Sequence, residues 1–211
     1  MNPIKMRPVV YTYFEPVPEL PQDDELALIN VWRDSWYAQG WQPIVLSPMT
    51  VADDGYYAYY DKLFTYPNVN AKKYEMACML RWWWLRRVGG GLMVDYDVMN
   101  HGFKPDDLIL EDGVLNLVRC PCAVYASVKG CGTLIEAIKN FDLAKCDYSN
   151  GVPYVHDQVV VRAEFDKLGL KELDVCKEPK DVGADVAKLV HYTNEWSYKE
   201  NKRPRWKYVA A

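Results

Sequence analysis

The alternation of apolar and polar residues near the start of the chain predicts a strand, a helix and a second strand. Residues 7–14 are mostly β-branched and aromatic and end at a Glu-Pro-Val-Pro segment, which predicts the first strand. The acidic residues 23–25 favour a helix start, and the helical pattern continues to about Gln39, before Gly40. A short apolar run at residues 42–46 predicts the second strand. Together these elements are typical of an α/β fold with a mostly parallel central sheet flanked by helices.

Two further stretches carry apolar residues at helical spacing. Residues 52–64 contain four tyrosines and predict a short helix that ends before Pro67. These tyrosines could line an acceptor cleft, or they could pack half-buried against the core. From Lys72 the pattern predicts a longer helix, which ends at the glycines 89–91 and is followed by an apolar strand.

Arg81 and two aspartates are the unusual residues of this region. On a helical wheel Arg81 falls inside an apolar stripe, and a buried arginine needs a carboxylate or a phosphate as a partner. The stripe consists of Ala77, Leu80, Trp84, Leu85 and Val88. Asp95 and Asp97 end the predicted strand, so strand alternation predicts that both point to one side and Tyr96 to the other. Carboxylates this close favour a cation beside them, although a purely structural pair of Arg81 with an aspartate is an alternative.

A family resemblance rests on the order of these features. Arg81 is followed by three tryptophans, a glycine break and an apolar strand that ends Asp95-Tyr96-Asp97-Val98. Over residues 72–100 this order resembles the nucleotide-sugar-binding region of GT-A glycosyltransferases, and most closely the DXD sugar-binding group that includes glycosyltransferase family 32. The family usually carries an aspartate three residues before the arginine, where this chain has Cys78.

The resemblance implies an activity and its substrates. It implies a single GT-A-like domain over residues 1–211, with a nucleotide-binding fold. The expected reaction is metal-dependent transfer of a sugar from a nucleoside-diphosphate sugar, with UDP or GDP as the carrier, to a glycan or another hydroxyl acceptor. If family 32 is the true relative, the resemblance also implies retention of the anomeric configuration.

Metal and phosphate contacts are also implied by the resemblance. Asp97 and His191 are the expected metal ligands, and Asp95 is expected on the metal or on the ribose. His191 ends an apolar run and has Trp196 a few residues on, like the C-terminal segment of these transferases, although a lone histidine after a strand often has no such role. Oxygen ligands with one imidazole suit Mn²⁺ or Mg²⁺. Arg81 is a catalytic candidate that would meet the donor phosphates or orient the aspartates.

Donor contacts are expected around the strand ends. Nucleotide-binding α/β folds place ligands beyond the carboxyl ends of their strands, where Tyr11, Thr12 and Tyr13 could stack on or hydrogen-bond to a base. They could equally be ordinary strand residues. Tyr96 is counted with the donor-binding residues. Gly132 is another candidate, since the resembled enzymes have a small-residue turn near the sugar donor, although a plain capping turn explains it as well.

Asp157 is the second catalytic candidate. In GT-A transferases an acidic residue in a comparable place often approaches the acceptor or the reacting sugar. Gln158, which is counted with the donor-binding residues, and His156 would lie beside Asp157. The alternative is an aspartate that caps a helix running to Phe165.

Composition narrows the remaining possibilities. The chain has 211 residues, of which 50% are hydrophobic and 14% aromatic, enough for a sizeable core. The formal net charge of −4 argues against a general nucleic-acid binder. No stretch approaches about 18 uninterrupted apolar residues and the first residues lack a signal-peptide core, so we expect a cytoplasmic protein without a transmembrane segment. The six cysteines contain no Cys-x-x-Cys pair and are expected to be free thiols.

The chain from about residue 198 carries five basic residues against one acidic residue up to Lys207. Such a run is usually a solvated tail. A flap that closes over a diphosphate, or adhesion to an anionic surface, is the alternative.

Two other functions compete with the transferase. The segment 93–98 superficially resembles the nucleophile motif of haloacid dehalogenase-like phosphatases, but that motif normally lies on the first strand and needs later motifs that this chain lacks. A non-catalytic accessory protein that binds sugar or nucleotide is the other competitor, favoured by Cys78 at the usual aspartate position.

Overall fold

The computed structural model describes ten segments of the chain. They are residues 7–18, 22–48, 54–69, 71–108, 114–116, 121–149, 151–164, 171–172, 176–177 and 187–192. The predicted basic tail from about residue 198 and Trp196 lie outside the described residues.

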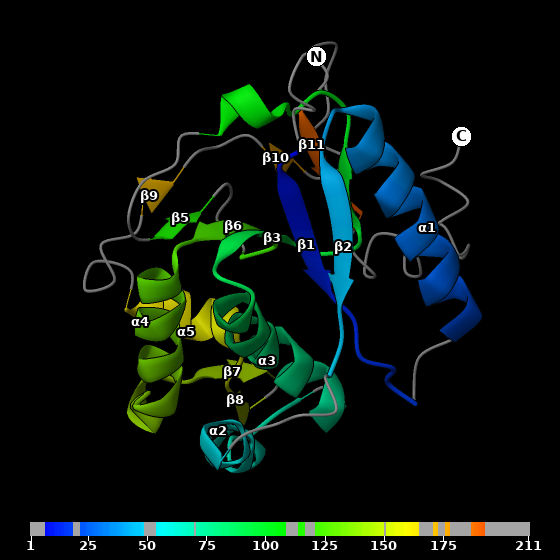
Figure 1. The fold of residues 1–211 in the computed structure, drawn as a ribbon. Coiled ribbons are helices and arrows are strands. Elements are labelled where there is room, and N and C mark those ends of the chain that lie inside the picture. The colour runs from blue at the N-terminus through cyan, green and yellow to red at the C-terminus, as the bar shows by residue number, and fades with distance from the viewer. Residues whose placement is uncertain are drawn as a thin grey trace.

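A mixed, mostly parallel sheet of six strands forms the centre of the fold (Figure 1). Its order is β2-β1-β3-β6-β5-β9, in which β1 lies parallel to β2 and β3, β5 lies parallel to β9, and β6 runs antiparallel to β3 and β5. The strands are β1 (Val9–Tyr13), β2 (Gln42–Leu46), β3 (Gly91–Val94), β5 (Val114–Asn116), β6 (Ala123–Ala126) and β9 (Lys171–Glu172). Together with the helices this sheet confirms the predicted fold class.

Helices cover both faces of the sheet (Figure 1). One face packs against α1, whose acidic first turn suits the positive end of the helix dipole. The other face packs against α2, α3, α4 and α5. The helices are α1 (Gln22–Ala38), α2 (Asp54–Phe64), α3 (Lys72–Arg87), α4 (Val128–Lys139) and α5 (Asp157–Ala163), with short 3-10 turns η1 (Pro105–Asp107) and η2 (Leu143–Lys145).

Two smaller β elements complete the described fold. Strands β10 (Cys176–Lys177), β11 (Leu189–His191) and β4 (Val98–Asn100) form a sheet in that order, with β11 antiparallel to β4. Strands β7 (Asp147–Ser149) and β8 (Val152–Tyr154) form a hairpin. The small sheet brings Leu189–His191 beside the residues that follow β3 in the chain.

The turn between α3 and β3 requires glycine at residue 90. Gly90 has φ +79°, and a Cβ there would lie 2.6 Å from the carbonyl oxygen of Ala126. The predicted glycine break therefore lets the end of α3 approach the end of β6 directly. The stripe predicted for α3 is wrong at Val88, which follows the helix and is 37% exposed.

Two predictions from composition can be compared with the described residues. Cys78, Cys131 and Cys146 are free thiols, as predicted. Within the described segments, no helix has the length and apolar character needed to cross a membrane.

Candidate metal centre

A turn at the carboxyl end of β3 carries the two aspartates. The strand ends at Val94, and the Asp95 N–H donates to the Cys122 carbonyl at 2.7 Å. The Val98 N–H then donates to the Asp95 carbonyl at 2.9 Å, which closes the turn. The predicted strand alternation of Asp95 and Asp97 is therefore wrong, because neither residue belongs to a strand. The turn nevertheless brings the two carboxylates together.

His191 joins the aspartates through the small sheet. It pairs with Val98 in the register of β11 and β4, and the next N–H, of Tyr192, donates to the Asp97 carbonyl at 2.8 Å. The His191 Nε2 lies 3.3 Å from Asp97 Oδ1. One ligand atom each from Asp95, Asp97 and His191 can be chosen so that all lie within 4.8 Å of one another. His191 thus forms one cluster with two aspartates that precede it by more than 90 positions in the sequence, and all three residues are of types that bind metals.

Arg81 lies buried behind this cluster and is 5% exposed. Its Nη1 donates to Asp95 Oδ1, and its Nη2 donates to the Pro121 carbonyl at 2.7 Å. Its Nε and Nη2 both donate to Asp157 Oδ2, with the Nε bond at 3.1 Å. Arg81 therefore connects Asp95 and Asp157, which accept hydrogen bonds from opposite sides of its guanidinium.

Asp157 is the deepest carboxylate of the site. It is 3% exposed, and Oδ2 accepts a further hydrogen bond of 3.1 Å from Trp82 Nε1. It is the first residue of α5, but His156 caps the helix, since the His156 Nδ1 accepts from the Gln158 N–H at 3.2 Å. The helix ends at Ala163, short of Phe165.

The pKa values of the site reflect burial and crowded charge. Burial raises the pKa of Asp95 to about 6; Arg81 opposes this rise, and the neighbouring Asp97 adds to it. Burial also acts to raise the pKa of Asp157, but the Arg81 guanidinium, with a smaller effect of the nearby His156, outweighs it, so the pKa of Asp157 lies below its usual range. Burial acts to lower the pKa of Arg81, and the two carboxylates override it. Arg81 and Asp157 are thus charged at neutral pH.

These groups fit a hard divalent cation. Two carboxylates, those of Asp95 and Asp157, meet the Arg81 guanidinium, and Asp97 lies beside Asp95. Asp95 gives Oδ1 to Arg81, so its second oxygen can serve as a ligand. Two carboxylates and one imidazole are a donor set that Mn²⁺ and Mg²⁺ accept, with water or phosphate oxygens completing the shell. The chemistry of the cluster thus supports a possible metal site without identifying the metal.

The first strand ends beside this cluster. Parallel pairing places Tyr11 opposite Met93, so Tyr13 reaches the level of Asp95. The Tyr13 hydroxyl donates to Glu15 Oε2 at 2.8 Å, and burial with the nearby Glu15 raises the pKa of Tyr13. Tyr11 is half-buried against Gly91. These two tyrosines face the α3 side of the sheet.

Thr12 faces the other way. It is fully buried on the α1 side, two residues along β1 from the core residue Val10. Tyr96, in the aspartate turn, packs edge-on against Phe14 with ring centroids 5.8 Å apart. Thr12 is therefore turned away from the side on which Arg81 meets Asp95, whereas Tyr96 borders the candidate centre.

Gly132, a candidate donor contact, lies away from this cluster. It lies inside α4 rather than in a turn, and its nearest side chain is that of Arg86. The helix cap is Ser127, whose hydroxyl accepts from the Gly130 N–H at 3.1 Å. Because β6 runs antiparallel to β3, α4 begins near the amino end of β3, and the aspartates lie at its other end.

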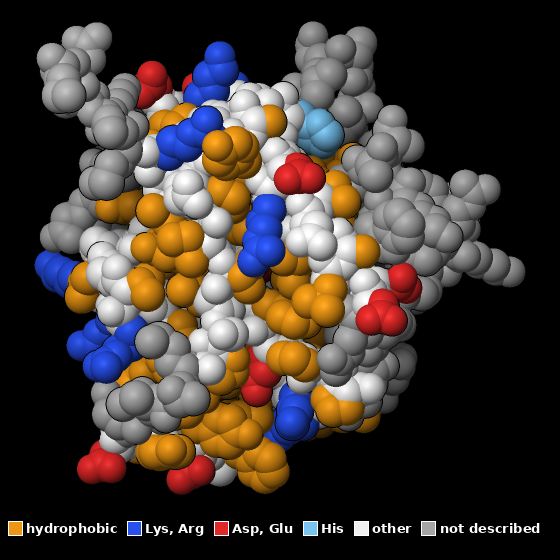
Figure 2. Space-filling model, turned by 45° about the vertical axis from the view of Figure 1, so that its right-hand side comes forward, with side chains coloured by type: hydrophobic (Ala, Val, Ile, Leu, Met, Phe, Trp, Pro, Cys, Tyr) orange, Lys and Arg blue, Asp and Glu red, His pale blue; other side chains and the backbone are white. Residues whose placement is uncertain are grey.

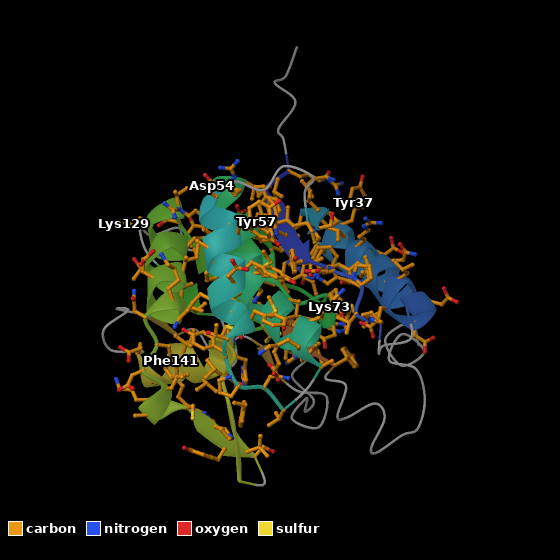
Figure 3. The ribbon with its side chains drawn as sticks, turned by 90° about the horizontal axis from the view of Figure 1, so that it is seen from below. Tyr37, Asp54, Tyr57, Lys73, Lys129 and Phe141 are labelled. Atoms are coloured by element: carbon orange, nitrogen blue, oxygen red, sulfur yellow. The ribbon has the colours of Figure 1, made fainter. Side chains whose placement is uncertain are left out.

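The tyrosine-rich helix α2 lies on the outer side of the α3 layer (Figure 3). Tyr56 and Tyr59 are buried and contact Trp83, with ring centroids 6.1 and 5.7 Å apart. Tyr57 is 56% exposed, on the opposite side of the sheet from Tyr37 of α1. Tyr56 and Tyr59 thus follow the packing alternative, while Tyr57 is open to solvent.

Three groups of the site went unrecognised in the sequence. Trp82 lies off the apolar stripe of α3, and the Pro121 carbonyl is a backbone group that no side-chain pattern marks. Glu15 was assigned only to the segment that ends the first strand. The three acceptors around Arg81 come from distant parts of the chain, and the one available signal was the buried position of Arg81 itself.

Cys78 replaces the aspartate that the resembled family usually carries. It is half-buried one turn before Arg81, and burial with the negative Asp157 raises its pKa, so it is a neutral thiol.

Figure 2 shows one face of the surface, on which hydrophobic side chains spread between Lys and Arg side chains that stand apart from one another.

Comparison with solved structures defines the class: the chain has a glycosyltransferase-like fold. A glycosyltransferase involved in the glycosylation of the major capsid of PBCV-1 superposes with a TM-score of 0.58 at 8% identity, over 98% of this chain and 100% of that one. The apo structure of the bifunctional glycosyltransferase WbbM gives 0.53 at 13% identity, over 99% of this chain and 50% of that one. At these identities the likeness concerns the fold alone.

The family is shown by sequence. The chain belongs to the family described as a domain of unknown function (DUF8765), whose profile matches residues 1–111. The matched segment contains Arg81, Asp95 and Asp97, while Asp157 and His191 follow it. No curated protein sequence matches the chain.

Proposed function

We propose that this protein is a metal-dependent glycosyltransferase with a single GT-A-like domain. One observation carries the proposal: Asp95, Asp97 and His191 gather within 4.8 Å at the carboxyl end of β3 in a glycosyltransferase-like fold. Ligands of open α/β sheets bind at such strand ends. The substrates would be a nucleoside-diphosphate sugar, with UDP or GDP, and a glycan or another hydroxyl acceptor. The resemblance to family 32 favours retention of configuration.

Each residue of the cluster has a proposed task. Asp95, Asp97 and His191 would hold Mn²⁺ or Mg²⁺. A divalent cation at this place would stabilise the negative charge of the departing diphosphate. Arg81 would orient Asp95, the second of the tasks predicted for it, because three of its hydrogen bonds go to Asp157 and Pro121 rather than outward.

The donor would lie across the ends of β1 and β3. Tyr13 reaches the level of Asp95, and Tyr96 borders the same edge through its contact with Phe14. Tyr11 and Gln158 are half-buried and keep their proposed places among the donor contacts. Phenol rings are suited to stacking on a nucleobase or a sugar ring.

Calorimetric titration tests the donor site. UDP and GDP are each added with and without Mn²⁺ to the wild type and to Asp97→Ala. We expect metal-dependent binding of one nucleotide, lost in Asp97→Ala. Lack of binding to either nucleotide under every metal condition would overturn the proposal.

Turnover separates the transferase from its competitors. Hydrolysis of a nucleotide sugar is expected from the transferase, and turnover of generic phosphate esters from a phosphatase. Nucleotide binding with no turnover of any nucleotide sugar or acceptor would instead support the accessory protein, for which Cys78 is the relevant feature.

A further inference from the structure

We infer that Asp157 is a positioning residue that balances the charge of Arg81, so that Asp95 stays available to a cation. This inference rests on the proposed metal site. It gives Asp157 a task different from the acceptor contact expected from the sequence. Asp157 would act through Arg81 and would touch neither the metal nor the substrate.

The contacts of Asp157 all point into the protein. The side chain is 4% exposed, and Oδ2 receives hydrogen bonds from Arg81 Nε, Arg81 Nη2 and Trp82 Nε1. Its Oδ1 lies 3.8 Å from the His156 Nδ1. A carboxylate so enclosed is poorly placed to approach an acceptor hydroxyl, which must arrive from solvent.

Arg81 is held in one orientation between two competing anions. Its Nε and Nη2 face Asp157, its Nη1 faces Asp95, and the Pro121 carbonyl fixes Nη2 from a third direction. The guanidinium also lies over the Trp82 ring, 4.7 Å from its centroid. These contacts fix the orientation of the guanidinium between the two carboxylates.

Electrostatics explains why the second aspartate is needed. A guanidinium that touches Asp95 competes with a divalent cation for the same carboxylate, because both are positive. Asp157 accepts two hydrogen bonds from Arg81, whereas Asp95 accepts one. Asp157 therefore forms the stronger ion pair and offsets the charge of Arg81. Without that negative charge, the whole field of Arg81 would act on Asp95 and on any cation beside it.

The experiment compares Mn²⁺ affinity across four proteins by calorimetry without nucleotide. Asp157→Asn removes the charge and keeps an oxygen that can accept from Arg81 and Trp82. We expect it to weaken Mn²⁺ binding about 10–100-fold, the usual effect of changing a residue that supports a metal ligand. The matched control is Trp82→Phe, which removes a hydrogen bond to Asp157 but leaves its charge, and should keep the affinity within about threefold.

A double variant separates charge balance from packing. Arg81→Gln combined with Asp157→Asn removes both charges, so it should bind Mn²⁺ more tightly than Asp157→Asn alone. If Asp157→Asn fails to fold, the double variant should still bind within about tenfold of the wild type. Equal weakening by Asp157→Asn and Trp82→Phe, or unchanged affinity in Asp157→Asn, would overturn the inference alone. A wild type that binds no Mn²⁺ would overturn both the proposed metal site and this inference.

Discussion

The two faces of the central sheet solve the burial of polar groups in different ways. On the α1 side, three tryptophans and Phe103 pack together, and the indole N–H groups of Trp36 and Trp41 donate to backbone carbonyls at 3.0 and 2.9 Å. On the α3 side, an equally buried layer contains the charged groups of Arg81 and Asp157. The hydrogen bonds of Trp36 and Trp41 are neutral, whereas the α3 side contains the ion pairs of Arg81 with Asp95 and Asp157.

The difference indicates which side is built for stability and which for chemistry. Neutral indoles bonded to backbone carbonyls combine a large apolar area with satisfied polar atoms. Buried ion pairs stabilise a fold little, because desolvation offsets the attraction. Within the segments that the structure describes, one cluster combines residue types that bind metals. The charged side chains of Arg81 and Asp157 lie behind its Asp95. We infer that the α3 side keeps its charges for binding.

The largest effect on stability is expected on the neutral side. Trp36→Ala should lower the free energy of unfolding by about 4 kcal/mol, because a fully buried indole leaves a cavity and the Val98 carbonyl loses its donor. Urea denaturation measures this change. Tyr37→Ala is the control, since the neighbouring Tyr37 is 53% exposed and should cost far less. Equal losses in the two variants would remove the claim that Trp36 anchors this face.

A somewhat smaller loss is expected from breaking the ion pairs. Arg81→Met should lower the free energy of unfolding by about 3 kcal/mol, because Asp157 would remain buried without its cation. The exposed Arg86, on the same helix, provides the control Arg86→Met. Denaturant melts of both variants at pH 7 give the comparison. If Arg81→Met were as stable as the wild type, Asp157 would have to find another partner.

The sequence predicted the neutral side better than the charged one. The first strand and the helix that follows it were predicted from local periodicity, which depends only on the element itself. The short-range pattern also located Arg81 in the core and the aspartates near the end of β3. Local alternation failed for Asp95 and Asp97, because the turn that carries them is fixed by bonds to Cys122 and Tyr192, which are distant in sequence.

Long-range pairing also explains the other differences. The partners of Arg81 are 14, 40 and 76 residues away, and no periodicity predicts such distances. Gly132 was misplaced because the sequence does not reveal that β6 runs antiparallel to β3, which sends α4 to the far end of the strand. His191 was identified by resemblance to a family segment, and its position beside Asp97 depends on the pairing of β11 with β4.

A pH dependence distinguishes the two sides further. The folded-state pKa of Asp95 is raised to about 6, above its usual unfolded value of about 3.9. Between these values the folded protein binds more protons than the unfolded chain, so stability should rise as pH falls from 7 to 5 in the presence of a chelator. The pKa of Asp157 is lowered, so its contribution is already complete above about pH 4.

Asp95→Asn provides the reference for this experiment. Burial lowers the pKa of His101, so its effect on stability has the opposite sign, and His101 is present in both proteins. The difference between wild type and Asp95→Asn therefore reports Asp95 together with the groups coupled to it, His191 and Asp97 among them. If that difference did not change between pH 7 and pH 5, Asp95 would already be charged throughout, and Arg81 would dominate its environment.

The smallest change in metal-free stability is expected from Asp97→Asn. Asp97 holds its place through backbone bonds, since the Tyr192 N–H donates to its carbonyl at 2.8 Å, and this bond survives the substitution. We expect the free energy of unfolding to change by less than about 1 kcal/mol in the presence of a chelator. The matched control is Asp106→Asn, an exposed aspartate of η1.

Stabilisation by Mn²⁺ should depend most on Asp97, the residue whose substitution is expected to change the metal-free stability least. At 100 times its dissociation constant, a ligand that binds only the folded state stabilises it by about 2.7 kcal/mol. Thermal melts should show that gain in the wild type and in Asp106→Asn, and no gain in Asp97→Asn. The residue that is least important for the apo fold would then be the most important for the response to metal, as expected if the α3 side carries charge for binding. A gain that persists in Asp97→Asn would place the cation elsewhere and remove the functional contrast between the two faces.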